Sequence, residues 1–415
     1  MKSMHGVALT AALLLLTPVV GCSSGAAPTA VRPVEAVDVS GLVHTSAGGD
    51  ADPAKPLTVT ADQGGHLTDV TVTGADGRVV AGQLAADRTS WQSTARLKAG
   101  TRYAVRVAAE DDHGRRGETT SEFGTAAAQH LLTAVLGPDS SGTGLYGVGQ
   151  PLTVQLSEAV KDPAGRQEVE RGLTVVSEPA VTGAWYWVDD KNLHFRPKEY
   201  WPANAKIRLG YDLQGVPVTA GLNGGEPVGL SLRTGDRVEV TVDAASHYLT
   251  FRRNGAEVRS IPVTTGKPGF STRNGIKVVL GKEASVRMNG ETIGIKQGST
   301  EAYDLEVKWA TRVTWSGEYV HAAPWSVGSQ GVDNVSHGCT GMSTENAQWF
   351  YDQTRIGDLV QVVNSKGAAM EPFGNGFGDW NIPWDEWLKH SALGRAVSTA
   401  GSSGTQVAGS APLLG

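Results

Sequence analysis

The stretch HAAPWSVGSQGVDNVSHGCTG, residues 321–341, contains His321, His337 and Cys339, and Cys339 is one of only two cysteines in the chain. A thiol is an effective nucleophile only as a thiolate, so it needs a nearby base or a cation that lowers its pKa. A histidine that the fold brings against Cys339 would supply both. This stretch therefore indicates a cysteine–histidine site and a fold that closes a loop around it.

The residues next to these side chains predict a strand and a returning loop. The run Gly317–Val320 is strand-like, and His321 ends it. Side chains alternate along a strand, so Tyr319 and His321 share one face. The loop before Cys339 is rich in glycine and serine, so it can fold back until the thiol meets the imidazole. Gly338 allows a close backbone approach, and neighbouring backbone N–H groups could then form an oxyanion hole.

The same residues are also compatible with a zinc site or with an inert thiol. His321, His337 and Cys339 could supply three zinc ligands, although the spacings CxxC and HExxH are missing. A single cysteine can also be buried and inert, although a His-Gly-Cys sequence beside many glycines is poor core material. The residues alone leave both alternatives open.

Ser336-His337-Gly338-Cys339, with a histidine at this distance upstream, resembles the signature of the L,D-transpeptidase catalytic domain. The segments HAAPWSVGSQG (residues 321–331) and GDWNIPWDEW (residues 378–387) make the resemblance closer to the mycobacterial and other actinobacterial members. Those members carry a lipobox and tandem Ig-like domains, so the resemblance extends from Cys22 to about residue 390.

The resemblance implies a role for each matching residue. Cys339 would be the nucleophile and His321 its base, with the backbone carbonyl of Ala322 fixing the imidazole tautomer. The remaining matches would hold the loop, the oxyanion and the substrate: Ser336, His337 and Gly338 in the cysteine loop, Tyr303 with its hydroxyl toward the oxyanion, and Met288 and Trp325 beside the cleft. Tyr303 and Met288 as ordinary cleft or core residues remain an alternative. Gly341 departs from the family pattern, which usually has asparagine there.

The implied reaction is acyl transfer in peptidoglycan without a metal or other cofactor. Cys339 would attack a donor tetrapeptide stem, and the side-chain amine of an acceptor stem would resolve the thioester to give a 3→3 crosslink. Carbapenem-type β-lactams would acylate the same thiol. Two alternatives stay open: an L,D-carboxypeptidase, in which water resolves the thioester, and a non-catalytic peptidoglycan-binding lipoprotein.

The composition of the chain limits the possible classes of protein. The 415 residues carry 36 Lys+Arg and 42 Asp+Glu, a formal net charge of −6, which argues against a nucleic-acid partner. Hydrophobic residues make up 40% and charged residues 19%, as in globular proteins. The 53 glycines and 19 prolines indicate many turns between short strands.

The N-terminus predicts export and a lipid anchor. Lys2 precedes an apolar run from Val7 to Val20, which is typical of a secretory signal and short for a membrane span. The following Val19-Val20-Gly21-Cys22 resembles a bacterial lipobox, which implies lipidation of Cys22. We expect the protein on the outer face of the bacterial cytoplasmic membrane, anchored by its acyl chains.

We expect a mainly β protein with two Ig-like β-sandwich domains before a β-rich catalytic domain with one or two helices. The sequence LKAGTRYAV places Leu97, Gly100 and Tyr103 as in the tyrosine corner of an Ig-like sandwich. The predicted boundaries are a signal peptide at 1–21, a tether at 22–35, Ig-like domains at 36–128 and 129–234, a catalytic domain at 235–364, a Trp-rich segment packed on that domain at 365–390, and a disordered tail at 391–415.

Overall fold

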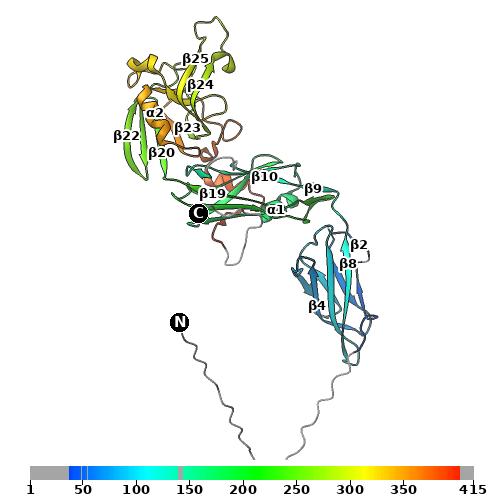
Figure 1. Ribbon diagram of the computed structural model, residues 1–415. Coiled ribbons are helices and arrows are strands. Elements are labelled where there is room, and N and C mark those ends of the chain that lie inside the picture. The colour runs from blue at the N-terminus through cyan, green and yellow to red at the C-terminus, as the bar shows by residue number, and fades with distance from the viewer. Residues whose placement is uncertain (1–36, 48, 54, 139–143, 402–415) are drawn as a thin grey trace, which may run out of the picture.

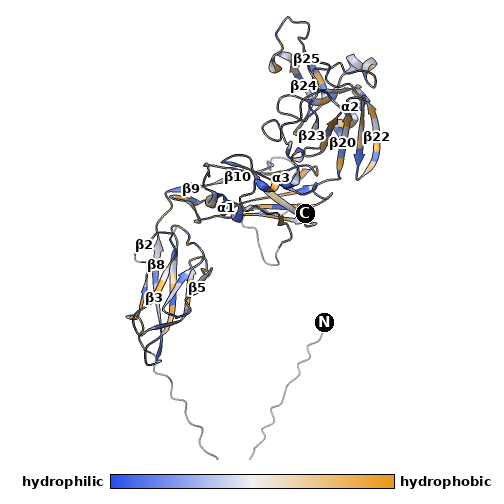
Figure 2. Cartoon of the chain, turned by 180° about the vertical axis from the view of Figure 1, so that it is seen from behind, coloured by the Kyte–Doolittle hydropathy of each residue, from blue (hydrophilic) through white to orange (hydrophobic). Residues whose placement is uncertain are grey.

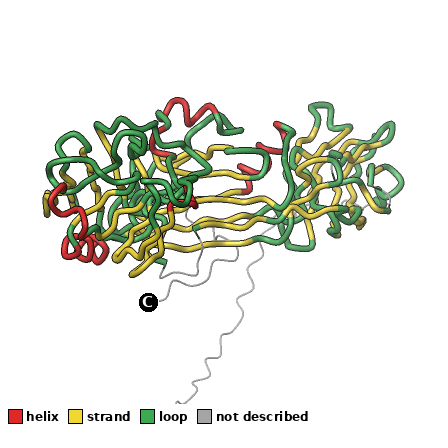
Figure 3. The backbone as a smooth tube through the Cα atoms, turned by 90° about the horizontal axis from the view of Figure 1, so that it is seen from above, coloured by secondary structure: helices red, strands yellow, loops and turns green. Residues whose placement is uncertain are grey.

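The structure is a computed structural model that describes residues 37–47, 49–53, 55–138 and 144–401. Two β-sandwiches and a β-rich C-terminal unit form an elongated row in chain order (Figure 1). Strands dominate all three units, and the helices are few and short (Figure 3). The predicted signal peptide, tether and Cys22 lie outside the described residues. Within the described ranges, no helix is long and apolar enough to cross a membrane.

The first sandwich packs two four-stranded sheets, ordered β1-β3-β6-β5 and β2-β8-β7-β4, around one apolar core. The strands are β1 (Val43–Thr45), β2 (Asp50–Ala51), β3 (Thr58–Ala61), β4 (His66–Gly74), β5 (Gly82–Leu84), β6 (Ser90–Ser93), β7 (Arg102–Glu110) and β8 (Arg116–Thr125). The backbone N–H of Lys98 donates to the Tyr103 hydroxyl at 2.7 Å, and the Tyr103 ring stacks on Phe123. The predicted tyrosine corner is therefore confirmed.

The second sandwich packs the sheets β10-β12-β15-β14-β29 and β11-β19-β16-β13, with a small sheet β17-β18-β9 at one end. Hydrophobic and hydrophilic residues are mixed along the strands of the molecule (Figure 2), and Trp185 and Trp187 are buried in the core of this sandwich. The strands are β9 (His130–Leu132), β10 (Ala134–Gly137), β11 (Leu145–Tyr146), β12 (Leu152–Leu156), β13 (Leu173–Glu178), β14 (Thr182–Trp187), β15 (Asn192–Pro197), β16 (Lys206–Tyr211), β17 (Pro217–Thr219), β18 (Leu222–Gly224), β19 (Val228–Thr234) and β29 (Val397–Ser398).

This sandwich also contains helix α1 (Pro163–Gly172), which the sequence pattern did not predict. Its start, Pro-Ala-Gly, has the composition of a turn, and the helix has only 10 residues. The Asp162 carboxylate caps it by accepting the N–H of Gly165 at 2.8 Å, and proline at the first helical position needs no hydrogen-bond partner.

The C-terminal unit joins a five-stranded sheet, β22-β21-β20-β28-β23, to a four-stranded sheet, β24-β25-β26-β27. Helix α2 (Thr344–Gln353) is capped by Ser343 and packs against β25 and β26. The strands are β20 (Val238–Asp243), β21 (Tyr248–Arg253), β22 (Ala256–Pro262), β23 (Gly275–Val278), β24 (Gly281–Asn289), β25 (Asp304–Arg312), β26 (Tyr319–Ala322), β27 (Thr340–Met342) and β28 (Leu359–Val363). The short helices are η1 (Gly290–Ile293), η2 (Pro324–Ser329), η3 (Asp379–Asn381) and α3 (Trp384–Lys389).

The Trp-rich segment corrects one expectation in part, because its first residues pack on the catalytic domain as expected whereas its tryptophans pack on the second sandwich. Asn274 of the catalytic domain donates to the Gly367 carbonyl at 3.0 Å and accepts the N–H of Met370 at 2.6 Å. The fully buried Trp387 donates its indole N–H to the Ala184 carbonyl on β14 at 3.0 Å. The Arg196 guanidinium of β15 lies 4.5 Å from the centre of the Trp387 ring. A further contact with the catalytic sheet comes from Asn381, whose Oδ1 accepts the N–H of Ile276 at 2.8 Å. It therefore joins the two units.

Residues 391–401 of the predicted disordered tail are ordered, which is a second correction. The buried Glu170 carboxylate of α1 accepts the Ser391 hydroxyl at 2.8 Å, and Val397–Ser398 adds strand β29 beside β14. Thr399 is fully buried. A few specific hydrogen bonds hold this segment in place. Since it does not bury a regular apolar face, its sequence shows no hydrophobic periodicity.

Candidate active site

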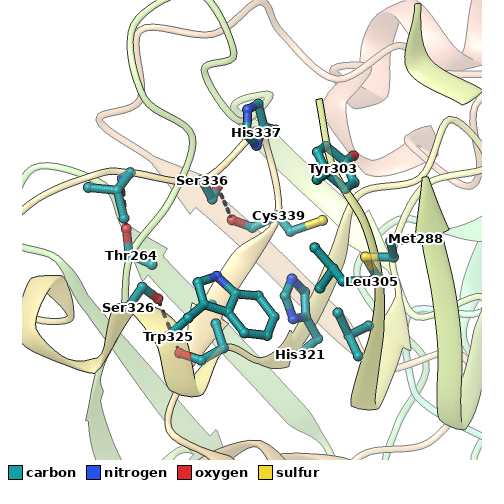
Figure 4. Close-up of a pocket in the computed structure, with 14 residues that line it drawn as sticks. Thr264, Met288, Tyr303, Leu305, His321, Trp325, Ser326, Ser336, His337 and Cys339 are labelled. Atoms are coloured by element: carbon teal, nitrogen blue, oxygen red, sulfur yellow. Dashed lines mark hydrogen bonds between the residues drawn. The ribbon is translucent and has the colours of Figure 1, made fainter. Parts of the chain in front are cut away.

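Parallel pairing of β26 with β27 builds the site. His321 lies opposite Gly341 in the register, so the end of the long loop, at Cys339, returns beside the strand that carries the histidine. The β24–β25 hairpin forms a further wall (Figure 4). The pocket has a volume of about 270 Å³ and brings together the predicted side chains of Met288, Tyr303, His321, Trp325, Ser336, His337 and Cys339.

The imidazole of His321 is buried and oriented by the backbone. Its Nδ1 lies 2.8 Å from the carbonyl oxygen of Ala322, which can only accept, so Nδ1 carries the proton. Nε2 is then left with a lone pair for a proton from the pocket. Burial lowers the pKa of His321, which keeps the ring neutral and able to act as a base.

The thiol of Cys339 is protonated in this resting arrangement. Its Sγ donates a hydrogen bond to the Gly317 carbonyl at 3.5 Å. Cys339 is also partly accessible to solvent. Desolvation raises the pKa of Cys339 to about 11, whereas a cationic histidine beside it would have lowered that pKa. The site therefore starts as a neutral thiol and a neutral imidazole, and proton transfer must accompany attack.

The cysteine loop is closed by its own hydrogen bonds. The Ser336 hydroxyl donates to the Cys339 carbonyl at 2.6 Å and accepts the N–H of Gly338 at 3.1 Å. Gly338 has φ of +122°, which a residue with a side chain rarely adopts. The Gly338 N–H is therefore directed at Ser336 and shapes the loop, and an oxyanion hole made by the neighbouring backbone N–H groups stays a prediction.

His337 is held by an acidic partner that the sequence motifs did not identify. Its Nε2 lies 2.7 Å from Oε2 of Glu301, which also binds the Lys267 ammonium. The hydrogen bond from Lys267 and, to a smaller extent, the one from His337 lower the pKa of Glu301. The His337 ring lies 5.0 Å from the Tyr303 ring, so Glu301 fixes the histidine against the pocket wall. The only sequence signal was the position of Glu301 two residues before Tyr303.

The other walls are mostly apolar. Met288 pairs with Leu305 across the hairpin, and Trp325 on η2 is 60% exposed at the rim. Tyr303 lies on the far side of the thiol from His321 (Figure 4), and burial raises its pKa, so its hydroxyl stays protonated and able to donate. Sequence reasoning missed the pocket residues Thr264, Leu305, Val307, Ala323, Ser326 and Val335.

Gly341 is packed where no side chain fits without movement. It exchanges two backbone hydrogen bonds with Thr264, both 2.9 Å. A Cβ at position 341 would lie 2.9 Å from Cβ of Ala323 and 3.2 Å from Cγ2 of Thr264. The asparagine that the family usually has at this position would therefore not fit the pocket floor without movement of Ala323 or Thr264.

Within the described ranges, no group of three His, Cys, Asp or Glu side chains is arranged to hold a metal ion. The arrangement presents a thiol, a neutral base and a hydrogen-bond donor around one cavity, which suits nucleophilic chemistry at a carbonyl carbon.

Comparison with known proteins agrees with this class of site and fold. Residues 49–217 match the bacterial Ig domain, and residues 237–362 match the L,D-transpeptidase catalytic domain. The chain is 37% identical to L,D-transpeptidase 2 of Mycobacterium tuberculosis over 339 residues, 81% of each protein. It is 31% identical to L,D-transpeptidase 5 of that organism, over 83% of this chain and 75% of the relative. The chain belongs to the L,D-transpeptidase family.

The solved structures give a similar but shorter match. A structure of LD transpeptidase LdtMt1 in complex with imipenem covers 56% of this chain and all of that one, with 34% identity and a TM-score of 0.47.

The neutral resting thiol predicts a specific pH dependence of alkylation. We expect iodoacetamide to modify Cys339 slowly at pH 7.5, with the rate rising about tenfold per pH unit up to pH 9.5, because each unit below the pKa leaves tenfold less thiolate. Mass spectrometry of the Cys339 peptide measures the rate. The same chain in denaturant is the control and should level off above about pH 8.5. A plateau between pH 6 and 8 in the folded protein would instead show a preformed thiolate.

The packing at Gly341 predicts that Gly341→Ala lowers the free energy of unfolding by about 1–3 kcal/mol, because the new methyl group overpacks the pocket floor. Urea denaturation measures the loss. Adding Ala323→Gly removes the nearest atom and should recover most of it. Equal stability of Gly341→Ala and the parent protein would contradict this account of the site.

Proposed function

We propose that the protein is a peptidoglycan L,D-transpeptidase that forms 3→3 crosslinks through a thioester on Cys339. The observation that carries the proposal is the shared pocket of Cys339 and His321, with Nδ1 of His321 committed to the Ala322 carbonyl. That hydrogen bond leaves Nε2 as the base. Membership of the L,D-transpeptidase family supplies the class of substrate.

Acylation begins with proton transfer from Cys339 Sγ to His321 Nε2 as the sulfur attacks. The target is the carbonyl carbon of the third residue of a donor tetrapeptide stem. The C–N bond to the terminal D-Ala breaks, its amine takes the proton from His321, and a thioester remains. The Ala322 carbonyl stabilises the transient imidazolium through Nδ1–H.

The Tyr303 hydroxyl donates to the oxyanion that forms during attack, as expected from its retained proton and its place beside the thiol. Met288 and Trp325 hold the stem along the cleft. In the second half, the side-chain amine of an acceptor stem attacks the thioester, His321 removes its proton, and the thiolate leaves and is reprotonated.

A β-lactam of the carbapenem type would acylate the same sulfur. Attack on the lactam carbonyl opens the ring, so the nitrogen stays attached and no fragment diffuses away. A stable adduct on Cys339 is the expected result.

Incubation with a disaccharide-tetrapeptide tests the reaction. We expect the unmodified protein to give a crosslinked dimer that has lost one D-Ala, detected by liquid chromatography and mass spectrometry. Cys339→Ala should lose at least about 10³-fold of this activity because the nucleophile is gone, and it should form no carbapenem adduct. A carbapenem adduct that persists in Cys339→Ala would refute the assignment of Cys339.

Paired histidine variants supply the control for this experiment. His321→Gln should lose crosslinking, whereas His130→Gln, at an exposed position of the second sandwich, should keep it. Tripeptide without dimer would identify a carboxypeptidase, and no change in the substrate would favour a binding module.

The same proposal includes attachment to the outer face of the cytoplasmic membrane through lipid on Cys22. The apolar run before Cys22 supports it, and the two sandwiches would then carry the catalytic domain into the wall.

Cell fractionation tests the anchor. We expect the protein in the membrane fraction of an actinobacterial host, and Cys22→Ser in the soluble or secreted fraction, since the acyl chains provide the affinity. Ser23→Ala is the matched control. Membrane retention of Cys22→Ser would contradict the anchor.

A further inference from the structure

A buried network of charges lies behind the cysteine loop and is not used by the mechanism above. Lys277 on β23 has no exposed surface, and its ammonium binds Oε2 of Glu318, which is 6% exposed. Arg273 donates its backbone N–H and its Nη1 to Oε1 of the same carboxylate, each at 3.1 Å. Arg273 also binds Glu371 at 3.2 Å, near the surface.

This network fixes the backbone on which the thiol rests. Glu318 directly follows Gly317, whose carbonyl accepts the hydrogen bond from Cys339 Sγ. The Glu318 N–H donates to the Thr314 hydroxyl at 2.8 Å, and the Glu318 carbonyl accepts the N–H of Val313 at 3.0 Å. With both its backbone and its side chain held, Glu318 leaves the neighbouring Gly317 carbonyl little freedom to move.

Stability alone is a weak reason for such a pair. Removing two charges from water costs several kcal/mol per ion, and apolar replacements of buried ion pairs are often neutral or stabilising. Lys277 has no exposed surface and binds Glu318, the residue next to the Gly317 that contacts the thiol, so the pair points to a use in the reaction.

The charges of the network act on the sulfur in opposite directions. Beyond desolvation, which raises the pKa of Cys339, and a backbone hydrogen bond from Tyr319, which lowers it, the Glu318 anion raises that pKa and the Lys277 cation lowers it. Burial lowers the pKa of Lys277 itself, and Glu318 and Cys339 raise it. The other titratable groups around the thiol are His321, Tyr319, Tyr303 and His337.

We propose that Lys277 and Glu318 are positioning residues for Cys339. Glu318 holds the Gly317 carbonyl beneath the thiol, and Lys277 stabilises the negative charge on sulfur when the proton leaves and when the thioester is resolved. The proposal rests on Cys339 as the nucleophile of the proposed function.

Alkylation of Cys339 by iodoacetamide at fixed pH tests the charges without requiring acyl transfer. In Lys277→Met, iodoacetamide should modify Cys339 about tenfold more slowly than in the unmodified protein. Without the Lys277 cation the pKa of Cys339 rises, and the greater nucleophilicity of the more basic thiolate offsets only part of that effect. Glu318→Gln should alkylate faster, because the opposing anion is gone, yet form crosslinked dimer more slowly, because Gly317 is less firmly held.

Lys282→Met is the matched control. Lys282 is a partly buried lysine of the same domain whose ammonium binds the Thr354 carbonyl at 2.7 Å and lies 4.3 Å from the centre of the Tyr351 ring. In Lys282→Met, the rate of Cys339 alkylation should equal that of the unmodified protein. Lys277→Arg should restore part of the rate lost in Lys277→Met.

The opposite signs separate the proposal from a purely structural role. Loss of alkylation in both Lys277→Met and Glu318→Gln, or unchanged rates with lower melting temperatures, would overturn it. If Lys277→Met does not fold, the double variant Lys277→Met with Glu318→Met removes both charges, and it should alkylate more slowly than Glu318→Gln. Failure of Cys339→Ala to stop crosslinking would refute the proposed function instead, and the alkylation rates would still report on Lys277.

Discussion

The parallel pairing of β26 with β27 is the constraint on which the site depends. Two neighbouring parallel strands need a long connection, and here that connection contains η2 and the cysteine loop. The register places the strand residue His321 opposite Gly341, so Cys339 enters the sheet beside the histidine's own strand. A shift of one residue would turn His321 to the other face and remove it from the pocket. The hydrophobic residues Val320 and Met342, both buried in the same core, oppose such a shift.

The surroundings of the thiol explain why the reactive pair rests uncharged. A desolvated thiol and a desolvated imidazole both favour their neutral forms, so an ion pair would have to overcome two burial costs. The fold therefore fixes the orientation of the thiol and of the imidazole and leaves both groups neutral. The Ala322 carbonyl sets the tautomer of His321, and the Gly317 carbonyl orients the thiol. In the reaction we propose, charge appears on the sulfur only during attack, and the buried Lys277 ammonium then lowers its cost.

Most of the architecture, and the meeting of Cys339 and His321 in one pocket, can be predicted from the sequence because they depend on local patterns. The short strands and the tyrosine corner at Tyr103 each depend on residues that lie close together in the sequence. The failures depend on contacts between distant residues. Glu170 holds residues 391–393, and Glu301 holds His337, across separations that no local period encodes. The raised pKa of the thiol is equally hidden in the sequence, since desolvation comes from the assembled pocket.

Strand β23 shows why the second sandwich is more than a spacer. Successive side chains of a strand point to opposite faces, and here Val278 is part of the apolar core of the second sandwich while Lys277 binds Glu318 beside the nucleophile. Leu359 on the neighbouring β28 belongs to that same core. Because a close-packed core transmits strain, a displacement of Val278 by the second sandwich is passed on to Lys277, its neighbour on the same strand. The Trp-rich segment limits that movement by fastening to β14 through Trp387 and to β23 through Asn381. The precision of the site is therefore a property of two domains and the segment that joins them.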